Sequence, residues 1–349
     1  MRRFRRRRHT TLVYHLTHLF KQASIFCVVA LVLLLLAACG TSSAQGKKTI
    51  GLSLSSLSNT YFVAMDLGMK DEATKLGYNI IDDNADNDAA TQVSQVEDLV
   101  TQHVSLLIIN PVSSDGIVPA VRTANAAHIP VITVDRGAAG GKVATVIESN
   151  NVLLGREAMD SIASRLKQRY GQVRGNVVDL QGLLGTSSGD DRETGFAQEL
   201  HKYPQVKLVA SQAANFDQET AYNDMANILE VQPKIDAVFG ANDDNALGAL
   251  KAIQSANRFA PLGHPGHIVI VGIDGSEQAL QAIRAGQIDA TVTQNPLKMS
   301  ARAVDLGSAV LQGHQIQQQI YYPFMLVNLS NINSRSAKDY GLWGDEVPK

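Results

Sequence analysis

A set of polar and aromatic side chains follows the short apolar runs of this sequence. Its members are planar amides, carboxylates, guanidinium groups and aromatic rings, namely Asn59, Tyr61, Phe62, Asn110, Asp135, Arg136, Arg192, Phe216, Asn242, Asp274 and Gln294. The polar groups suit vicinal hydroxyls, because each hydroxyl is both a donor and an acceptor and bidentate groups match neighbouring pairs. The rings can lie flat on the C–H faces of a cyclic ligand. The set therefore predicts binding of a small, uncharged, hydroxyl-rich compound.

Each member of this set also has a purely structural interpretation. Asn and Asp at strand ends are common as turn formers or helix N-caps. Phe62 and Phe216, taken singly, are more often core residues than platforms for a ligand. The functional interpretation therefore depends on the whole set and not on any one residue.

Several other chemistries lack their motifs here. The strand ends carry no Ser–His pair, no His/Cys cluster and no Gly-rich phosphate loop. His264 and His267 have an i, i+3 spacing, but an exposed turn explains them better than a metal site because no Cys or Glu accompanies them. We expect neither a metal nor a cofactor.

A sugar hydrolase is the enzymatic alternative. Two carboxylates for acid and base catalysis could come from Asp135 with Asp274, or from the pair Asp243 and Asp244. Arg136 and Arg192 should keep both carboxylates ionised, which does not suit a general acid. We therefore expect a binding protein and not an enzyme.

From Thr49 onward, short β-branched runs alternate with segments of helical period, a pattern typical of parallel sheets with helices on both faces. The expected strands are Thr49–Leu54, Asn79–Asp82, Leu106–Asn110, Val131–Val134, Val143–Ile147, Asn176–Leu180, Val206–Ala210, Ala237–Gly240, Ile268–Gly272 and Ala290–Thr293. So many strands favour two α/β lobes, with a first break near Glu148–Asn151. The carboxyl ends of parallel strands share one edge, where ligands bind in doubly wound folds.

The charge distribution argues against nucleic acid as a partner. The chain has 31 Lys+Arg and 33 Asp+Glu, but residues 1–38 carry basic side chains and no acidic ones. The remainder is therefore strongly acidic, whereas a phosphate backbone needs clustered Lys and Arg on one face.

The N-terminal residues resemble an export signal. An Arg-rich stretch at residues 2–8 precedes an apolar run at 25–38, which is shorter than the roughly 20 residues of a spanning helix. Leu36–Gly40 resembles the lipobox of bacterial lipoproteins, so we expect cleavage before Cys39 and acylation of its thiol. The alternatives are a permanent transmembrane anchor or a chance Cys in an ordinary signal peptide. Residues 39–48 are expected to form a flexible tether.

Motifs from Lys47 to Tyr322 resemble, in order, the ribose-binding members of the type I periplasmic sugar-binding proteins. The matching segments are Asn59–Phe62, Ile108–Pro111, Pro130–Arg136, Gln181–Gly182 with Gly185–Ser187 and Arg192, Asn215–Asp217, Asn242–Gly248, Val271–Gly275 and Thr293–Pro296. The resemblance implies two doubly wound parallel-sheet lobes joined by a three-segment hinge. The implied bounds are 47–148 with 295–323 for the N-terminal lobe, 149–294 with 324–335 for the C-terminal lobe, and 336–349 for the tail. The stretch Ser330–Lys349 lacks a period and is expected to pack loosely.

The resemblance also assigns roles to the set of side chains. Its members match the pocket of the ribose binders, with Asn110 at a further position near that pocket. Phe62 and Phe216 would sandwich the sugar ring, and Arg136 and Arg192 would pair with Asp135 or Asp274 in the empty protein. Tyr61 is a departure, because ribose binders usually have Phe there.

The function implied is capture of a monosaccharide, ribose or a similar pentose or furanose, by hinge closure, with delivery to the membrane permease of an ABC sugar importer. The alternative is a sensor that presents the sugar to a chemoreceptor or two-component system. A LacI-type regulator shares the fold, but Met1–Ala38 has no helix-turn-helix. We expect an exported, extracytoplasmic monomer, anchored to the cell membrane by lipid on Cys39.

Overall fold

The computed structural model describes residues 47–347. The predicted export signal and Cys39 lie outside these residues. Within this range, none of the helices combines the length and the apolar character that crossing a membrane requires.

The first sheet has six strands, and every neighbouring pair in it is parallel. In spatial order they are β11 (Gln319–Tyr322), β5 (Thr145–Ser149), β4 (Val131–Val134), β3 (Leu106–Ile109), β1 (Thr49–Leu54) and β2 (Asn79–Asn84). Both faces are covered by helices, as the alternation along β3 shows. Leu106 and Ile108 belong to the core with α2 (Thr60–Lys75) and α10 (Pro296–Leu311), whereas the intervening residues face α3 (Ala89–Thr101) and α4 (Val118–Ala126).

The second sheet also has six strands, of which only the edge strand β12 is antiparallel to its neighbour. In spatial order they are β12 (Met325–Asn328), β10 (Ala290–Thr293), β9 (Val269–Asp274), β8 (Ala237–Gly240), β6 (Gly175–Gln181) and β7 (Val206–Ala213). One face packs on α5 (Asn151–Tyr170) and α6 (Ser187–Leu200). The other packs on α7 (Gln218–Val231), α8 (Asp243–Ser255) and α9 (Glu277–Arg284), so these strands too are apolar on both sides.

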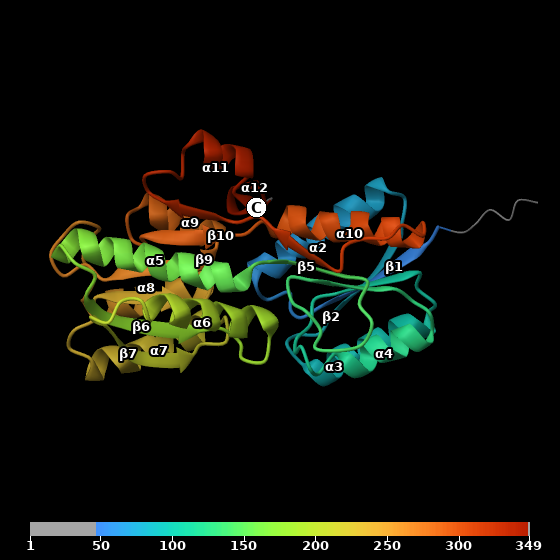
Figure 1. The fold of residues 1–349 in the computed structure, drawn as a ribbon, viewed down its shortest axis with the longest axis horizontal. Helices are drawn as coiled ribbons and strands as arrows, with labels where there is room; N and C mark the ends of the chain where they lie inside the picture. The colour runs from blue at the N-terminus through green and yellow to red at the C-terminus, as the bar shows by residue number, and fades with distance from the viewer. Residues whose placement is uncertain (1–46, 348–349) are drawn as a thin grey trace, which may run out of the picture. The chain divides into compact units, whose positions relative to one another are not determined.

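The chain passes between the two sheets three times. It leaves the first sheet after β5, returns after β10, and leaves again between β11 and β12. Figure 1 shows the result, with α10 beside α2 although the two helices are far apart in the sequence. The predicted fold class, two doubly wound parallel-sheet lobes joined by three segments, is confirmed. The residue bounds assigned to each lobe stay a prediction.

The expected strands all correspond to strands of the structure, and β1, β4, β8 and β10 have the predicted ends. The expected strands did not include β11 and β12, which have only four residues each and so give little periodic signal.

The expectation of a loosely packed tail was wrong. Residues 335–346 include α11 (Arg335–Tyr340) and α12 (Trp343–Glu346), and Trp343 is only 2% exposed. Two helices of one turn or so give no periodic signal, and tertiary burial of the indole holds them instead.

Candidate sugar-binding site

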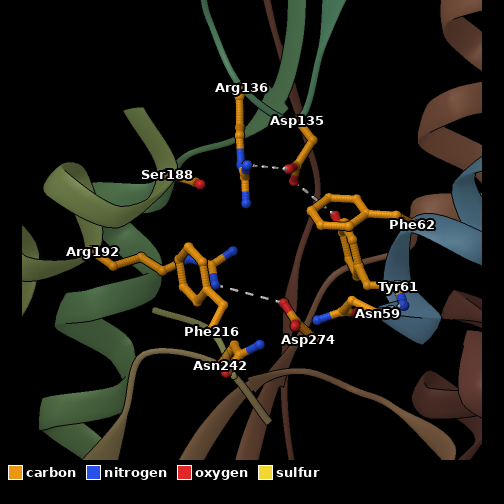
Figure 2. Close-up of a pocket in the computed structure, with 10 residues that line it drawn as sticks. All are labelled: Asn59, Tyr61, Phe62, Asp135, Arg136, Ser188, Arg192, Phe216, Asn242 and Asp274. Atoms are coloured by element: carbon orange, nitrogen blue, oxygen red, sulfur yellow. Dashed lines mark hydrogen bonds and ion pairs between the residues drawn. The ribbon is translucent and has the colours of Figure 1, made fainter. Parts of the chain in front are cut away.

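A pocket between the two lobes collects most of the predicted side chains at the carboxyl ends of the strands (Figure 2). The first lobe contributes Asn59, Tyr61, Phe62, Asp135 and Arg136, and the second contributes Ser188, Arg192, Phe216, Asn242 and Asp274. These residues lie in the turns after β1, β4, β7 and β8, in α2 and α6, or, for Asp274, at the last position of β9. The parallel topology thus brings together residues that are far apart in the sequence.

Two phenylalanines from different lobes flank one guanidinium group. The Cζ atom of Arg136 lies 5.1 Å from the ring centroid of Phe62 and 5.7 Å from that of Phe216. Arg192 approaches Phe216 as well, with its Cζ 5.3 Å from the centroid. The two rings therefore face a common space, and each presents a π-face to it.

Asp135 is 3% exposed and has close neighbours on both carboxylate oxygens. The Tyr61 hydroxyl donates to Oδ1 at 3.1 Å, and Asn110 Nδ2 donates to Oδ2 at 3.3 Å. Arg136 Nε lies 3.8 Å from Oδ2. Among residues 47–347, Arg136 Nε has no hydrogen-bond acceptor within hydrogen-bond distance, and Asp135 Oδ2 is its charged neighbour.

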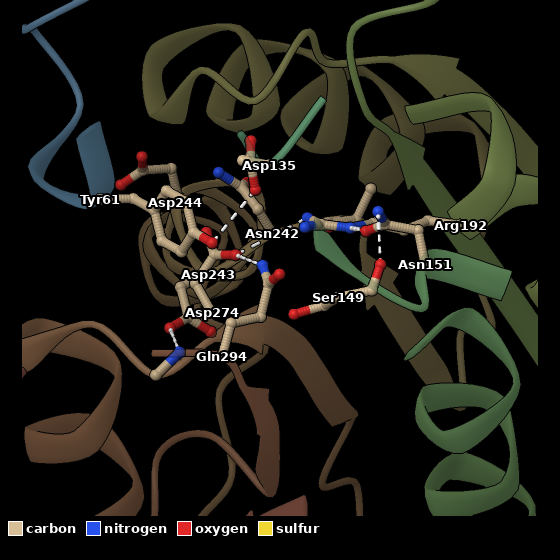
Figure 3. A network of polar contacts seen from close by, with 12 residues as sticks. Tyr61, Asp135, Ser149, Asn151, Arg192, Asn242, Asp243, Asp244, Asp274 and Gln294 are labelled. Carbon is tan, nitrogen blue, oxygen red and sulfur yellow. Dashed lines mark hydrogen bonds and ion pairs between the residues drawn. The ribbon is translucent and has the colours of Figure 1, made fainter. Parts of the chain in front are cut away.

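Asp274 forms the second charged centre of the pocket (Figure 3). Its Oδ1 lies 3.7 Å from Arg192 Nη1 and accepts from Gln294 Nε2 at 2.8 Å. Arg192 is oriented by two further acceptors, Asn151 Oδ1 at 2.9 Å and the Ala241 carbonyl at 2.7 Å. Each arginine thus lies beside an aspartate in the structure, and the predicted pairing in the empty protein stays a prediction.

The expectation that the arginines keep both carboxylates ionised stays a prediction, because burial and the guanidinium charge act on Asp274 in opposite directions. Burial raises the pKa of Asp274 well above its usual range, and the favourable charge of Arg192 offsets this only in part. Burial also raises the pKa of the Tyr61 phenol, with Asp135 and Asp274 adding to the effect. Tyr61 is therefore a neutral hydrogen-bond donor at physiological pH.

Two predicted residues lie behind the pocket and do not line it. Asn110 and Gln294 are both fully buried, and each donates to a carboxylate that does line it. Sequence reasoning missed Ser188, which lines the pocket at 2% exposure. The signal was present, because Ser188 precedes Arg192 by one helical turn and shares its face of α6.

The two lobes are joined by hydrogen bonds on both sides of the pocket. On one side Asn59 Nδ2 donates to Asp244 Oδ2 at 2.7 Å. On the other, the Ser187 amide donates to Ser114 Oγ at 3.1 Å, and Ser187 Oγ accepts from the Gly137 amide at 2.9 Å. These contacts require the lobes to lie close together, as in a closed form.

Comparison with known proteins gives a consistent picture. The periplasmic binding protein domain matches residues 50–315. The ribose import binding protein of Salmonella typhimurium is 38% identical over 305 residues, which cover 87% of this chain and 96% of that protein. The Bacillus subtilis protein of the same name is 37% identical, covering 87% of this chain and 98% of the relative.

Solved structures agree. An ABC transporter solute-binding protein from Bacillus halodurans with bound myo-inositol superposes with a TM-score of 0.77 at 28% identity, covering 85% of this chain and all of that one (100%). One from Actinobacillus succinogenes with bound D-allose gives 0.74 at 29% identity, covering 81% and 98%. These relatives are binding proteins of transport systems and not enzymes, in line with the expectation for this chain. The chain belongs to the periplasmic binding protein family.

Proposed function

We propose that this protein captures ribose, or a similar pentose or furanose, and delivers it to an ABC sugar importer. One observation carries the proposal: Phe62 and Phe216, from opposite lobes, face a common space bordered by the Asp135–Arg136 and Asp274–Arg192 pairs. This arrangement offers apolar surfaces to the faces of a sugar ring and charged groups to its edge. The ribose import relatives support ribose as the first candidate.

The sugar acts as the bridge between the lobes. Each sugar hydroxyl that bonds a charged side chain contributes roughly 1.5–3 kcal/mol to binding, because hydrogen bonds to charged groups are stronger than neutral ones. Both half-sites are complete only when the lobes meet, so the ligand favours the closed form by its differential affinity for it. A permease could then distinguish loaded from empty protein by the spacing of the lobes.

Membership of the periplasmic binding protein family supports a location outside the cytoplasm. The proposed lipid on Cys39 would keep the protein at the membrane surface, where its permease lies. Labelling of cells with an azido fatty acid, followed by comparison of wild type with Cys39→Ser, tests this anchor. Equal lipid labelling of the two proteins would contradict it.

A thermal-shift screen tests the ligand class. D-ribose, D-arabinose, D-allose, xylitol, myo-inositol and D-glucose form a suitable panel, because a ligand that binds only the folded state raises the melting temperature by mass action. We expect D-ribose to give the largest rise, and calorimetric titration should then give a stoichiometry of one. No shift with any member of the panel would refute the proposal.

A further inference from the structure

The C-terminal segment 335–347, called here the C-terminal clasp, is held firmly to the second lobe. Both terminal nitrogens of Arg284 on α9 contact the Asp345 carboxylate, at 2.9 and 2.6 Å. Leu342 is buried in the core that α9 shares with the sheet. Gly344 lies so close to the start of α9 that a Cβ there would come within 2.4 Å of the Glu277 amide nitrogen. The clasp therefore has a fixed position on this lobe.

The same segment also contacts the first lobe and the hinge. Asn295 Nδ2 donates to the Gly341 carbonyl at 3.0 Å, and Lys298 Nζ donates to the Tyr340 carbonyl at 2.8 Å. Both donors belong to the beginning of α10, which packs against α2. The Tyr340 hydroxyl lies 3.1 Å from the carbonyl oxygens of Thr293 and Pro323, one in each of two hinge segments. Figure 1 shows α12 beside α9.

Trp343 links the clasp to the pocket. Its ring meets the Tyr61 ring edge-on, with centroids 5.9 Å apart and an interplanar angle of 86°. Its Nε1 donates to the Asp274 carbonyl at 2.7 Å. Tyr61 belongs to the first lobe and Asp274 to the second, and both line the pocket. One buried indole therefore touches a pocket residue of each lobe from behind.

The conformation of Asp274 needs such support. Its φ is +128°, a region that residues with a side chain rarely adopt. Trp343 Nε1 and Thr293 Oγ1 both donate to the Asp274 carbonyl, and Asp243 accepts from the next two amides. Loss of the indole removes one of these restraints and, at the same time, the ring that packs against Tyr61.

We propose that Trp343 is a positioning residue for the sugar pocket, which it serves by fixing Tyr61 and Asp274 relative to each other across the hinge. This inference rests on the proposed sugar-binding function. Trp343 does not line the pocket, so it acts through the two residues that it touches. The clasp thus adds the C-terminal segment to the ligand-binding machinery.

Calorimetric titration with D-ribose tests the proposal in three variants. Trp343→Ala should weaken binding about tenfold or more, the equivalent of one lost hydrogen bond and its packing. Trp343→Phe keeps a ring against Tyr61 but loses the bond to Asp274, so a loss of about two- to fivefold is expected. Ile332→Ala is the matched control, because Ile332 is equally buried at 2% but lies in the second-lobe core away from the pocket. It should lower the melting temperature and leave the affinity within about twofold.

A double-mutant cycle separates positioning from general destabilisation. If Trp343 acts partly through Tyr61, the effect of Trp343→Ala should shrink to about threefold or less in a Tyr61→Ala background. Equal effects in both backgrounds would overturn positioning through Tyr61. Wild-type affinity in Trp343→Ala would overturn the proposal as a whole.

Amide hydrogen exchange, measured without sugar, tests whether Trp343 holds Tyr61 and Asp274 in place. Trp343→Phe and Trp343→Ala should speed exchange in residues 274–276 and in the first turn of α2, whereas Ile332→Ala should not. Unchanged exchange in both Trp343 variants would refute the positioning role of Trp343 even if the protein binds sugar. Failure of wild type to bind any sugar of the panel would instead refute the proposed function, and the exchange result would still stand.

Discussion

Residues of the pocket are held in place by partners that do not touch the ligand space. Asp135 is held by Asn110, and Arg192 is held by Asn151. Such prior orientation reduces the entropy that binding must overcome. Because these partners lie outside the ligand space, truncating one pocket side chain leaves the other pocket side chains held in their orientations.

Asp274→Ala should abolish measurable sugar binding and leave the fold intact. Its Oδ1 lies 3.7 Å from Arg192 Nη1, but Arg192 keeps its bonds to Asn151 and Ala241 in the variant. Calorimetry and far-UV circular dichroism give the two readouts. Asp98→Ala, on an exposed part of α3, is the matched control and should bind like wild type. Near-native affinity in Asp274→Ala would show that the site is assigned wrongly.

Tyr61→Phe tests the residue at which this chain departs from the ribose binders. The Tyr61 hydroxyl donates to Asp135 Oδ1. Without it, this oxygen gains a donor only when a sugar hydroxyl arrives, so D-ribose affinity should rise by about two- to tenfold. The variant should also be less stable to urea by about 1 kcal/mol, because the carboxylate loses a donor. Weaker ribose binding in Tyr61→Phe would instead indicate that the hydroxyl itself holds the sugar.

At the scale of elements, α6 carries the pocket residues Ser188 and Arg192 on one part of its surface and an acidic group on another. Glu193 and Asp179 on β6 lie close together, with Gln181 donating to the first and Ser211 to the second. Burial raises the pKa of Glu193 to about 9 and that of Asp179 to about 6, and the charge of Asp179 adds to the effect at Glu193. The pair therefore holds a proton at neutral pH.

Because of this pair, we expect the free energy of unfolding to decrease as the pH rises. The folded state binds the Glu193 proton more tightly than the unfolded state does, so unfolding free energy is lost as pH rises from the ordinary glutamate range, near 4.5, towards about 9. Glu193→Gln removes the titrating group. The free energy of unfolding of this variant, measured in urea, should therefore decline less than that of wild type between about pH 5 and about pH 9, the range between the two pKa values. Parallel curves for wild type and variant would show that the proton is not held there.

At the scale of the whole molecule, direct hydrogen bonds join the two lobes beside the pocket. Asn59 caps α2 with its Oδ1, which accepts from the Tyr61 amide, and uses its Nδ2 to reach Asp244 on the other lobe. Burial, together with the charges of Asp243 and Asp217, raises the pKa of Asp244 to about 7. This contact exists only when the lobes meet.

Asp244→Ala should therefore speed sugar release and leave capture unchanged. The encounter takes place with the open form, in which the Asn59–Asp244 contact is absent, so stopped-flow measurements should show an unaltered association rate. The dissociation rate should rise by about three- to tenfold, as expected for one lost hydrogen bond. Asp224→Ala, on the outer part of α7, is the control. A slower association in Asp244→Ala would contradict a role confined to the closed state.

The sequence determined the two-lobed α/β fold and most of the pocket. Apolar runs such as Leu106–Ile109 are buried on both faces, which marks parallel strands, and their polar ends must converge at one edge. Only the tertiary structure decided that Asn110 and Gln294 stand behind the pocket, that Ser188 lines it, and that Trp343 reaches it. Periodicity reports which side of an element is buried, but it does not report which distant side chain covers it. The C-terminal clasp has almost no hydrophobic periodicity. The position at which it packs depends on contacts with residues far away in the sequence, which a local pattern does not report.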